Sequence, residues 1–171
     1  MMSDIFVHYF FNLNPISLEH NFFKSNEKSV INRAFLYGDA VKVYFYIQNC
    51  RIIMAEECYF FLMASMRKMR MNIPLDYTLE FFENLFQKKV LSQGVQQAVI
   101  RFMVYREQRG SLLSKSGISY FFDFVERSIL DINPSIEMDL IKEISVNTNL
   151  LSNLQVHCPE NIYAEIYARE N

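Results

Sequence analysis

The sequence contains little glycine or proline and no tryptophan. Only 4 of its 171 residues are glycine and 4 are proline, whereas average usage predicts about 20 of these two residues together. Glycine-rich loops that cradle phosphates need several glycines close together, so a function built on such a loop is not expected. The G-x-S-x-G, Walker and H-E-x-x-H motifs are also absent from the sequence.

The sequence also lacks a dominant charge and a long apolar run. Its 17 basic and 19 acidic residues leave a net charge of −2, which provides no overall attraction to nucleic acid or to an anionic membrane. No apolar run reaches the roughly 18–20 residues needed to span a bilayer. Segment 1–11 is apolar but lacks the basic region and cleavage site of a signal peptide. We therefore expect a soluble cytoplasmic protein.

Cysteine is scarce as well. Cys50, Cys58 and Cys158 form no C-x-x-C pair and cannot all be paired within one chain. Reduced thiols in a cytosolic protein are the simpler interpretation. His157 and Cys158 lie near Glu160, but adjacent ligands without a second pair match no zinc spacing, so no metal site is expected.

Hydrophobic and aromatic residues are plentiful. They include 16 Phe, 10 Tyr and 9 Met, and hydrophobic residues make up 51% of the chain against 21% charged residues. This composition excludes a disordered tail and provides material for a packed core. The length suits one domain, or one domain and part of another.

The spacing of the apolar residues changes between a period of two and a period of 3.6 along the chain. Alternation predicts strands, and i, i+3, i+4 spacing predicts helices. The predicted strands cover 40–47, 52–54, 97–107 and 118–125, and the predicted helices cover 55–71 and 78–92. The order hairpin, two helices, hairpin indicates a compact α+β unit that closes near residue 125.

The flanking segments are less regular. We expect an irregular segment at 1–29, a small domain at 30–130 and the incomplete beginning of a second domain at 131–171. Segment 137–146 fits a strand or a helix equally well, whereas 160–169 is typical of a helix. The basic residues Arg67, Lys68 and Arg70 near the end of the first long helix are interpreted as complementing its dipole.

One segment resembles a known family. Residues 32–41 read NRAFLYGDAV, and residues 56–65, after the first hairpin, read EECYFFLMAS. This arrangement resembles the small domain of the class IV (fold type IV) pyridoxal-phosphate enzymes, with the pattern N-R-G-F-L-Y-G-D-G-V-F-E, a hairpin, then E-E-H-x-x-R-L-x-x-S-A. The group includes branched-chain and D-amino-acid aminotransferases and aminodeoxychorismate lyase. The matching motif residues are Arg33, Phe35, Gly38 and Asp39.

The resemblance implies an α+β small domain of two antiparallel hairpins with two helices, followed by a truncated second domain. It also implies pyridoxal phosphate held by an arginine fork and a Schiff-base lysine. Phe61 occupies the arginine position and Cys58 the histidine position before it, while Gln155 occupies the lysine position. No lysine lies between Lys142 and Asn171. Because a phenyl ring and a carboxamide supply neither function, we expect no cofactor and no catalytic residue.

Three interpretations follow. The first is a degenerate, non-catalytic relative, a pseudoenzyme acting through association, as a homodimer or as a heteromer with a complete homologue. The second is an active pyridoxal-phosphate aminotransferase or lyase that uses an unrecognised lysine, Lys142 or Lys115. The third is a gene fragment without a role. On the first interpretation, which we favour, neither nucleic acid nor a membrane is a partner, and the exposed apolar side of helix 160–169 is part of the interface.

Overall fold

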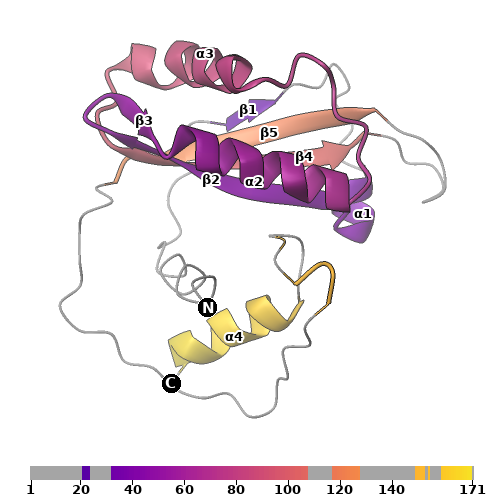
Figure 1. Ribbon diagram of the computed structural model, residues 1–171. Coiled ribbons are helices and arrows are strands. Elements are labelled where there is room, and N and C mark those ends of the chain that lie inside the picture. The colour runs from indigo at the N-terminus through magenta and orange to yellow at the C-terminus, as the bar shows by residue number, and fades with distance from the viewer. Residues whose placement is uncertain are drawn as a thin grey trace.

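The protein forms a five-stranded antiparallel sheet with two helices packed on it (Figure 1). A computed structural model describes residues 21–23, 32–107, 117–127, 149–152, 154 and 159–170. The elements are β1 (Asn21–Phe23), α1 (Arg33–Tyr37), β2 (Ala40–Gln48), β3 (Arg51–Ile53), α2 (Ala55–Lys68), α3 (Leu79–Lys89), η2 (Leu91–Gln93), β4 (Ala98–Arg106), β5 (Ile118–Val125) and α4 (Pro159–Glu170). The strand order in the sheet is β1-β5-β4-β2-β3.

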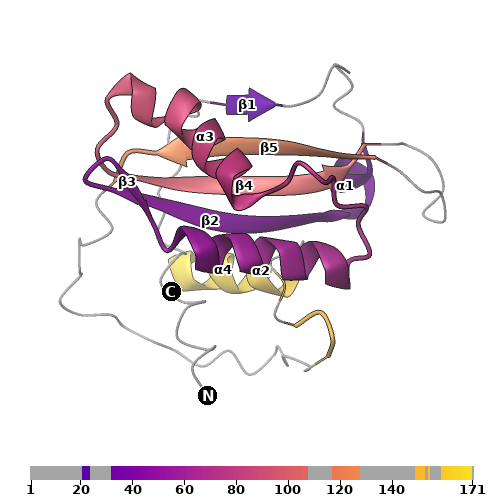
Figure 2. The ribbon, with the colours of Figure 1, turned by 45° about the horizontal axis from the view of Figure 1, so that its top comes forward.

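The core lies between the sheet and the helices. Both α2 and α3 cover the same face of the sheet (Figures 1 and 2). Alternation along β4 points Ile100, Phe102 and Val104 into this core, where all three are fully buried. Phe45 of β2 packs against Phe86 of α3 with ring centroids 4.9 Å apart. These aromatic contacts fix α3 on the sheet.

Charged side chains mark the ends of α2, and a capping side chain marks the start of α3. In α2, Glu56 and Glu57 lie in the first turn, and Arg67 and Lys68 lie in the last, which complements the helix dipole. In α3, the Thr78 side chain accepts a hydrogen bond from the Phe81 backbone N–H at 3.2 Å. The helices therefore begin and end close to where local chemistry favours.

The predicted α+β fold is confirmed, with differences in detail. The four predicted strands and the helices of the small domain are present, but β2 pairs with β4, so the two hairpins join in one sheet. α2 ends at Lys68 instead of residue 71, because Arg70 adopts a left-handed conformation with φ 52°. α3 ends at Lys89 and is followed by the 3-10 turn η2.

Two short elements were not predicted. The segment expected to be irregular contains β1, which pairs with β5 in the register Asn21–Asp123 to Phe23–Phe121. The motif segment contains the one-turn helix α1. The ambiguous segment 137–146 lies outside the described residues.

The predicted C-terminal helix is present as α4. Its side chains Ile162, Tyr163 and Ile166 are each about half exposed. Among the helices that the structure describes, none has the length and apolar character needed to cross a membrane.

Candidate functional site

The helix α1 is a single turn that depends on contacts outside itself. Its N-cap Asn32 accepts a hydrogen bond from the Phe35 N–H at 3.0 Å, and Gly38 ends it with φ 65°. The left-handed φ suits glycine, which has no Cβ to clash with the backbone. A helix of five residues is not stable alone, because nucleation is unfavourable and the chain gains few hydrogen bonds.

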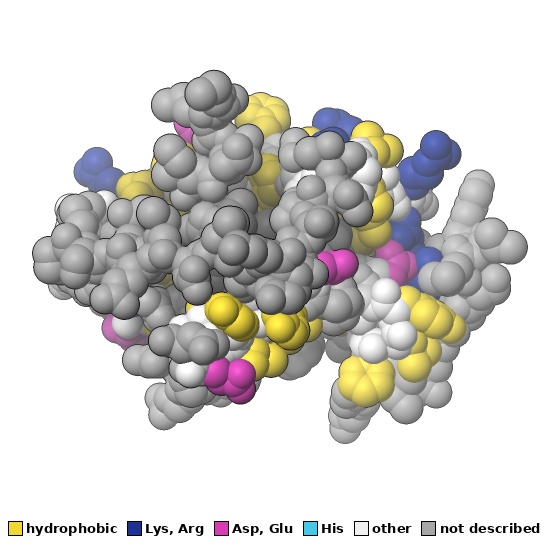
Figure 3. All heavy atoms as spheres, turned by 90° about the horizontal axis from the view of Figure 1, so that it is seen from below, with side chains coloured by type: hydrophobic (Ala, Val, Ile, Leu, Met, Phe, Trp, Pro, Cys, Tyr) yellow, Lys and Arg dark blue, Asp and Glu magenta, His cyan; other side chains and the backbone are white. Residues whose placement is uncertain are grey.

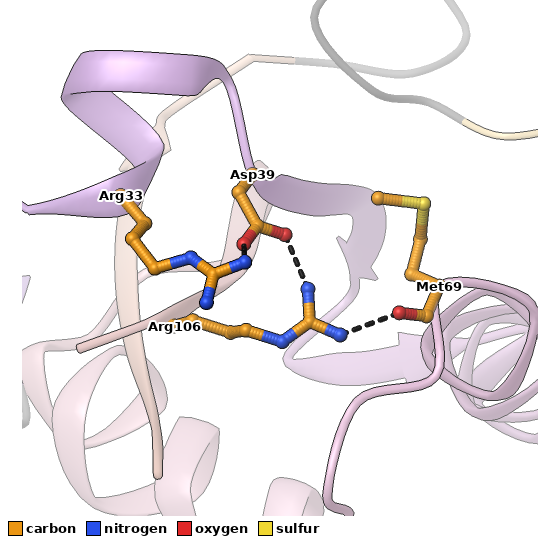
Figure 4. A network of polar contacts seen from close by, with 4 residues as sticks. All are labelled: Arg33, Asp39, Met69 and Arg106. Carbon is orange, nitrogen blue, oxygen red and sulfur yellow. Dashed lines mark hydrogen bonds and ion pairs between the residues drawn. The ribbon is translucent and has the colours of Figure 1, made fainter. Parts of the chain in front are cut away.

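A buried ion-pair network holds α1 in place (Figure 4). Arg33 at its start forms an ion pair with Asp39 just beyond its end, with Nη2 and Oδ2 2.6 Å apart. Arg106 at the end of β4 binds the other carboxylate oxygen, Oδ1, and also donates to the Met69 carbonyl at 2.5 Å. Arg33, Asp39 and Arg106, which we name the clamp, therefore join α1, β2, β4 and the end of α2.

The burial and the ion pairs of the clamp suit it to a structural role. Arg33 and Asp39 are 3% and 7% exposed, and both oxygens of the carboxylate are engaged by guanidinium groups. Charge-assisted contacts of this kind are strong and directional. The geometry therefore fixes the position of α1.

Fixing α1 directs its apolar side chains outward. Phe35, Leu36 and Tyr37 are 68%, 45% and 53% exposed. Of the four predicted motif residues, the structure brings Arg33 and Asp39 into contact and places Gly38 at the helix end between them. Phe35 lies on the exposed surface instead. The motif segment thus presents three apolar side chains at the surface.

The first half of α2 contains the two positions at which the resemblance implies cofactor contacts. Cys58 is buried; burial, followed by the charge of Glu57, raises the pKa of its thiol from 9.0 to about 11, so the thiol is protonated at neutral pH. Phe61 is half-buried and packs against the hydrophobic core. Neither side chain carries a positive charge for an anion.

A second polar pair lies on the sheet face opposite the helices. Arg101 of β4 and Asp123 of β5 are cross-strand partners, joined by a two-point ion pair in which Nε and Oδ1 are 3.0 Å apart. Burial lowers the pKa of Arg101, but the hydrogen bond and charge of Asp123 outweigh it, so its pKa is raised. Alternation along β4 places Arg101 on the face away from the core, but sequence reasoning missed its partner.

Comparison with solved structures identifies the fold. A T.th. branched-chain amino acid aminotransferase superposes with a TM-score of 0.57 at 16% identity, covering 70% of this chain and 43% of that chain. The Escherichia coli branched-chain enzyme gives 0.54 at 11% identity, covering 65% and 40%. A protein described as a candidate 4-amino-4-deoxychorismate lyase, from Legionella pneumophila, gives 0.51 at 15%, covering 62% and 39%.

The described chain has the fold of the class IV aminotransferases. It spans less than half the length of these structural neighbours. No protein-family model matches the sequence, and no curated protein matches it. The likeness is thus one of fold, and it confirms the resemblance carried by residues 32–41 and 56–65 at that level.

The class IV fold implies pyridoxal phosphate, and the residues present can be tested for fit. Phosphate binding requires N–H donors or positive charge, whereas Phe61 is hydrocarbon packed on the core and Cys58 is a protonated thiol. These two residues do not fit the cofactor phosphate. Gln155, Lys142 and Lys115 lie outside the described residues.

A metal centre was not expected. Within the described ranges, no group of three or more His, Cys, Asp or Glu side chains is arranged to hold an ion. His157 and Cys158 lie outside those ranges.

Proposed function

We propose that this protein is a non-catalytic relative of the class IV aminotransferases that acts by associating with a second copy of itself. One observation carries the proposal. The clamp that shapes the motif segment is intact, while position 61 is occupied by a hydrocarbon side chain packed on the core.

The substitutions affect separate chemical roles. A carbonyl cofactor needs a primary amine for the Schiff base and a cationic site for its phosphate. Phe61 lacks the cation, and on the resemblance Gln155 lacks the amine. Loss of both roles supports a function that does not depend on the cofactor. The activity in the names of the structural neighbours is therefore not expected of this chain.

Exposed apolar side chains support the association. Phe35 and Tyr37 on α1 and Ile162 and Ile166 on α4 are each 48–68% exposed. Contiguous exposed apolar surface commonly marks a protein interface, and closed twofold dimers are the commonest homo-oligomers. A homodimer accounts for both groups with one arrangement.

The absence of catalysis is tested by trapping. The protein is incubated with pyridoxal phosphate, reduced with borohydride, digested and analysed by mass spectrometry. We expect no stoichiometric pyridoxyl-lysine, whereas a branched-chain aminotransferase treated alongside gives one.

A stoichiometric adduct on one lysine would contradict the proposal. Lys115 and Lys142 are the lysines to inspect first. The variants Lys115→Ala and Lys142→Ala then show which side chain forms the adduct. Substoichiometric labelling spread over several lysines is the expected background of an aldehyde reagent and agrees with the proposal.

A further inference from the structure

One side of α2 is closed around the two positions where the resemblance implies contacts to a cofactor. Cys58, Phe61 and Ser65 follow one another at spacings of three and four, so they lie on one side of the helix. Cys58 and Ser65 are 8% and 1% exposed, and Phe61 packs against the hydrophobic core. A ligand that approached this side of α2 would have to displace core contacts.

The polar groups on this side of α2 are already bonded or are weak donors. The Ser65 hydroxyl donates to the Phe61 carbonyl at 2.7 Å, and the Cys58 N–H donates to the Met54 carbonyl at 3.0 Å. The Cys58 thiol is protonated at neutral pH because burial raises its pKa, and a thiol is a weak donor. The side chains of Cys58, Phe61 and Ser65 therefore offer a phosphate no strong donor.

The charge around the first turn of α2 is negative. Glu56 and Glu57 lie in this turn and are exposed, and the charge of Glu57 is one of the causes that raise the pKa of Cys58. The two carboxylates offset the positive end of the helix dipole. No lysine or arginine occurs in the sequence between Arg51 and Arg67, and Arg67 lies in the last turn of the helix. An anion at the start of α2 would therefore be repelled.

We infer that this part of α2 excludes anions, so that the chain binds neither pyridoxal phosphate nor pyridoxamine phosphate, even without a covalent bond. The inference rests on the proposed function and extends it from the reaction to the binding of the cofactor. A chain that had lost only the Schiff-base lysine would still hold the phosphate through an arginine fork. In this chain a packed hydrocarbon side chain, a protonated thiol and two carboxylates oppose the phosphate together.

The side chains that support association lie elsewhere in the molecule. Figure 3 shows two groups of exposed hydrophobic side chains on one face. The groups are Phe35, Leu36 and Tyr37 on α1 and Ile162, Tyr163 and Ile166 on α4. Neither group includes a residue of α2, so association through them needs no ligand at α2. The self-association of the chain is therefore independent of the cofactor.

Equilibrium dialysis with pyridoxamine phosphate tests the exclusion. This compound has an amine in place of the aldehyde, so it forms no Schiff base with a lysine and reports non-covalent binding alone. Pyridoxamine, which lacks the phosphate, is the matched ligand. We expect the full chain to show no saturable binding of either compound up to about 1 mM. A cofactor-free branched-chain aminotransferase is the positive control, since a structural neighbour of that name carries pyridoxamine 5'-phosphate.

A second test measures the local charge through Cys58. The full chain carries Cys50→Ser and Cys158→Ser, and the remaining cysteine is labelled with carbon-13 at Cβ, so that NMR follows the pKa of its thiol. Glu57→Gln should lower this pKa, because the neutral amide removes a charge that favours the protonated thiol. Glu83→Gln, an exposed change in α3, is the matched control and should leave the pKa unchanged.

The dimer constant tests the independence of association from the cofactor. Sedimentation equilibrium of the wild-type chain should give the same constant with and without pyridoxamine phosphate at the highest concentration used in dialysis. A constant that shifts with pyridoxamine phosphate and not with pyridoxamine would overturn the inference.

The outcomes separate anion exclusion from the loss of catalysis. Saturable binding of one pyridoxamine phosphate per chain, not shared by pyridoxamine, would overturn the inference; without a lysine adduct it would leave the proposed function standing. A pKa of Cys58 that Glu57→Gln leaves unchanged would contradict the negative charge on which the inference depends and would overturn it too. A stoichiometric pyridoxyl-lysine after treatment with pyridoxal phosphate would overturn both the inference and the proposed function.

Discussion

Arg33 and Asp39 lie at opposite ends of α1, and their side chains meet 2.6 Å apart in the protein interior. The ion pair links the two ends of this single helical turn. Arg106 binds the same carboxylate and the Met69 carbonyl, which connects α1 to β4 and to the end of α2. The exposed apolar side chains of α1 therefore depend on buried charges for their position. This relationship makes the clamp the first target for mutation.

Replacing Asp39 should destabilise the fold strongly. Asp39→Asn keeps the size of the side chain but leaves two guanidinium groups, Arg33 and Arg106, without their shared carboxylate. Breaking a buried ion pair from one side costs about 3–5 kcal/mol, and we expect a loss in this range from urea unfolding followed by circular dichroism.

The matched control is Arg67→Gln, an exposed change at the end of α2. Its effect should stay within about 0.5 kcal/mol. Equal stability of Asp39→Asn and the wild type would show that the clamp does not hold the fold.

The turn between β2 and β3 should become more stable with glycine. Asn49 and Cys50 both have left-handed φ values, 51° and 59°, and asparagine–glycine is the favoured pair in two-residue hairpin turns of this type. Cys50→Gly removes the clash of Cβ in this conformation, and we expect a gain of about 0.5–1 kcal/mol. Cys50→Ala, which keeps the Cβ, should show no such gain by the same unfolding measurement.

Stability should fall in alkaline solution above about pH 9. The raised pKa of Cys58, about 11 against an ordinary 9.0, means that the unfolded chain loses this proton first. The contribution is therefore complete below pH 9 and is lost as the pH rises towards 11. Burial also raises the pKa values of Tyr46 and Tyr77, which adds to the decline.

The contribution of Cys58 to the alkaline loss of stability is measured as the difference between the wild type and Cys58→Ala. Urea unfolding at about pH 7, 9 and 11 should show the stability advantage of the wild type over Cys58→Ala shrinking across the upper interval. A difference that is constant with pH would mean that the thiol is not buried as described.

Local patterns predicted the parts of the fold that local physics determines. Alternation over 97–107 predicted strand β4, because each side chain of such a strand either enters the core, as Ile100, Phe102 and Val104 do, or faces away from it. The helix α1 was missed because one turn is too short for a periodicity. Asn32 before it and Gly38 after it were the available signals.

Contacts between residues far apart in the sequence could not be predicted from these local patterns. Arg106 follows Asp39 by 67 positions, and only the pairing of β2 with β4 brings them together. Strand β1 has three residues and is defined by its pairing with β5. The motif therefore indicated which residues matter at the site, while the third member of the clamp required the fold.

Returning an arginine to position 61 should harm the protein without creating a cofactor site. Phe61 packs on the core, so Phe61→Arg loses that contact and forces a charge against apolar neighbours. We expect a loss of about 1–3 kcal/mol and still no borohydride-trapped adduct. Phe60→Arg, one residue earlier and 62% exposed, should be near neutral. An adduct in Phe61→Arg would show that a competent lysine is present.

The measurement that tests the account most directly is the molar mass of the wild-type chain in solution. Sedimentation equilibrium at micromolar concentration should give about twice the chain mass of 20.3 kDa, declining towards one chain on dilution. Hydrogen exchange at α4 should slow as the dimer forms. A mass near 20.3 kDa at every concentration, with α4 protected from exchange throughout, would contradict the account. The apolar side chains Ile162, Tyr163 and Ile166 of α4 would then be covered within one chain.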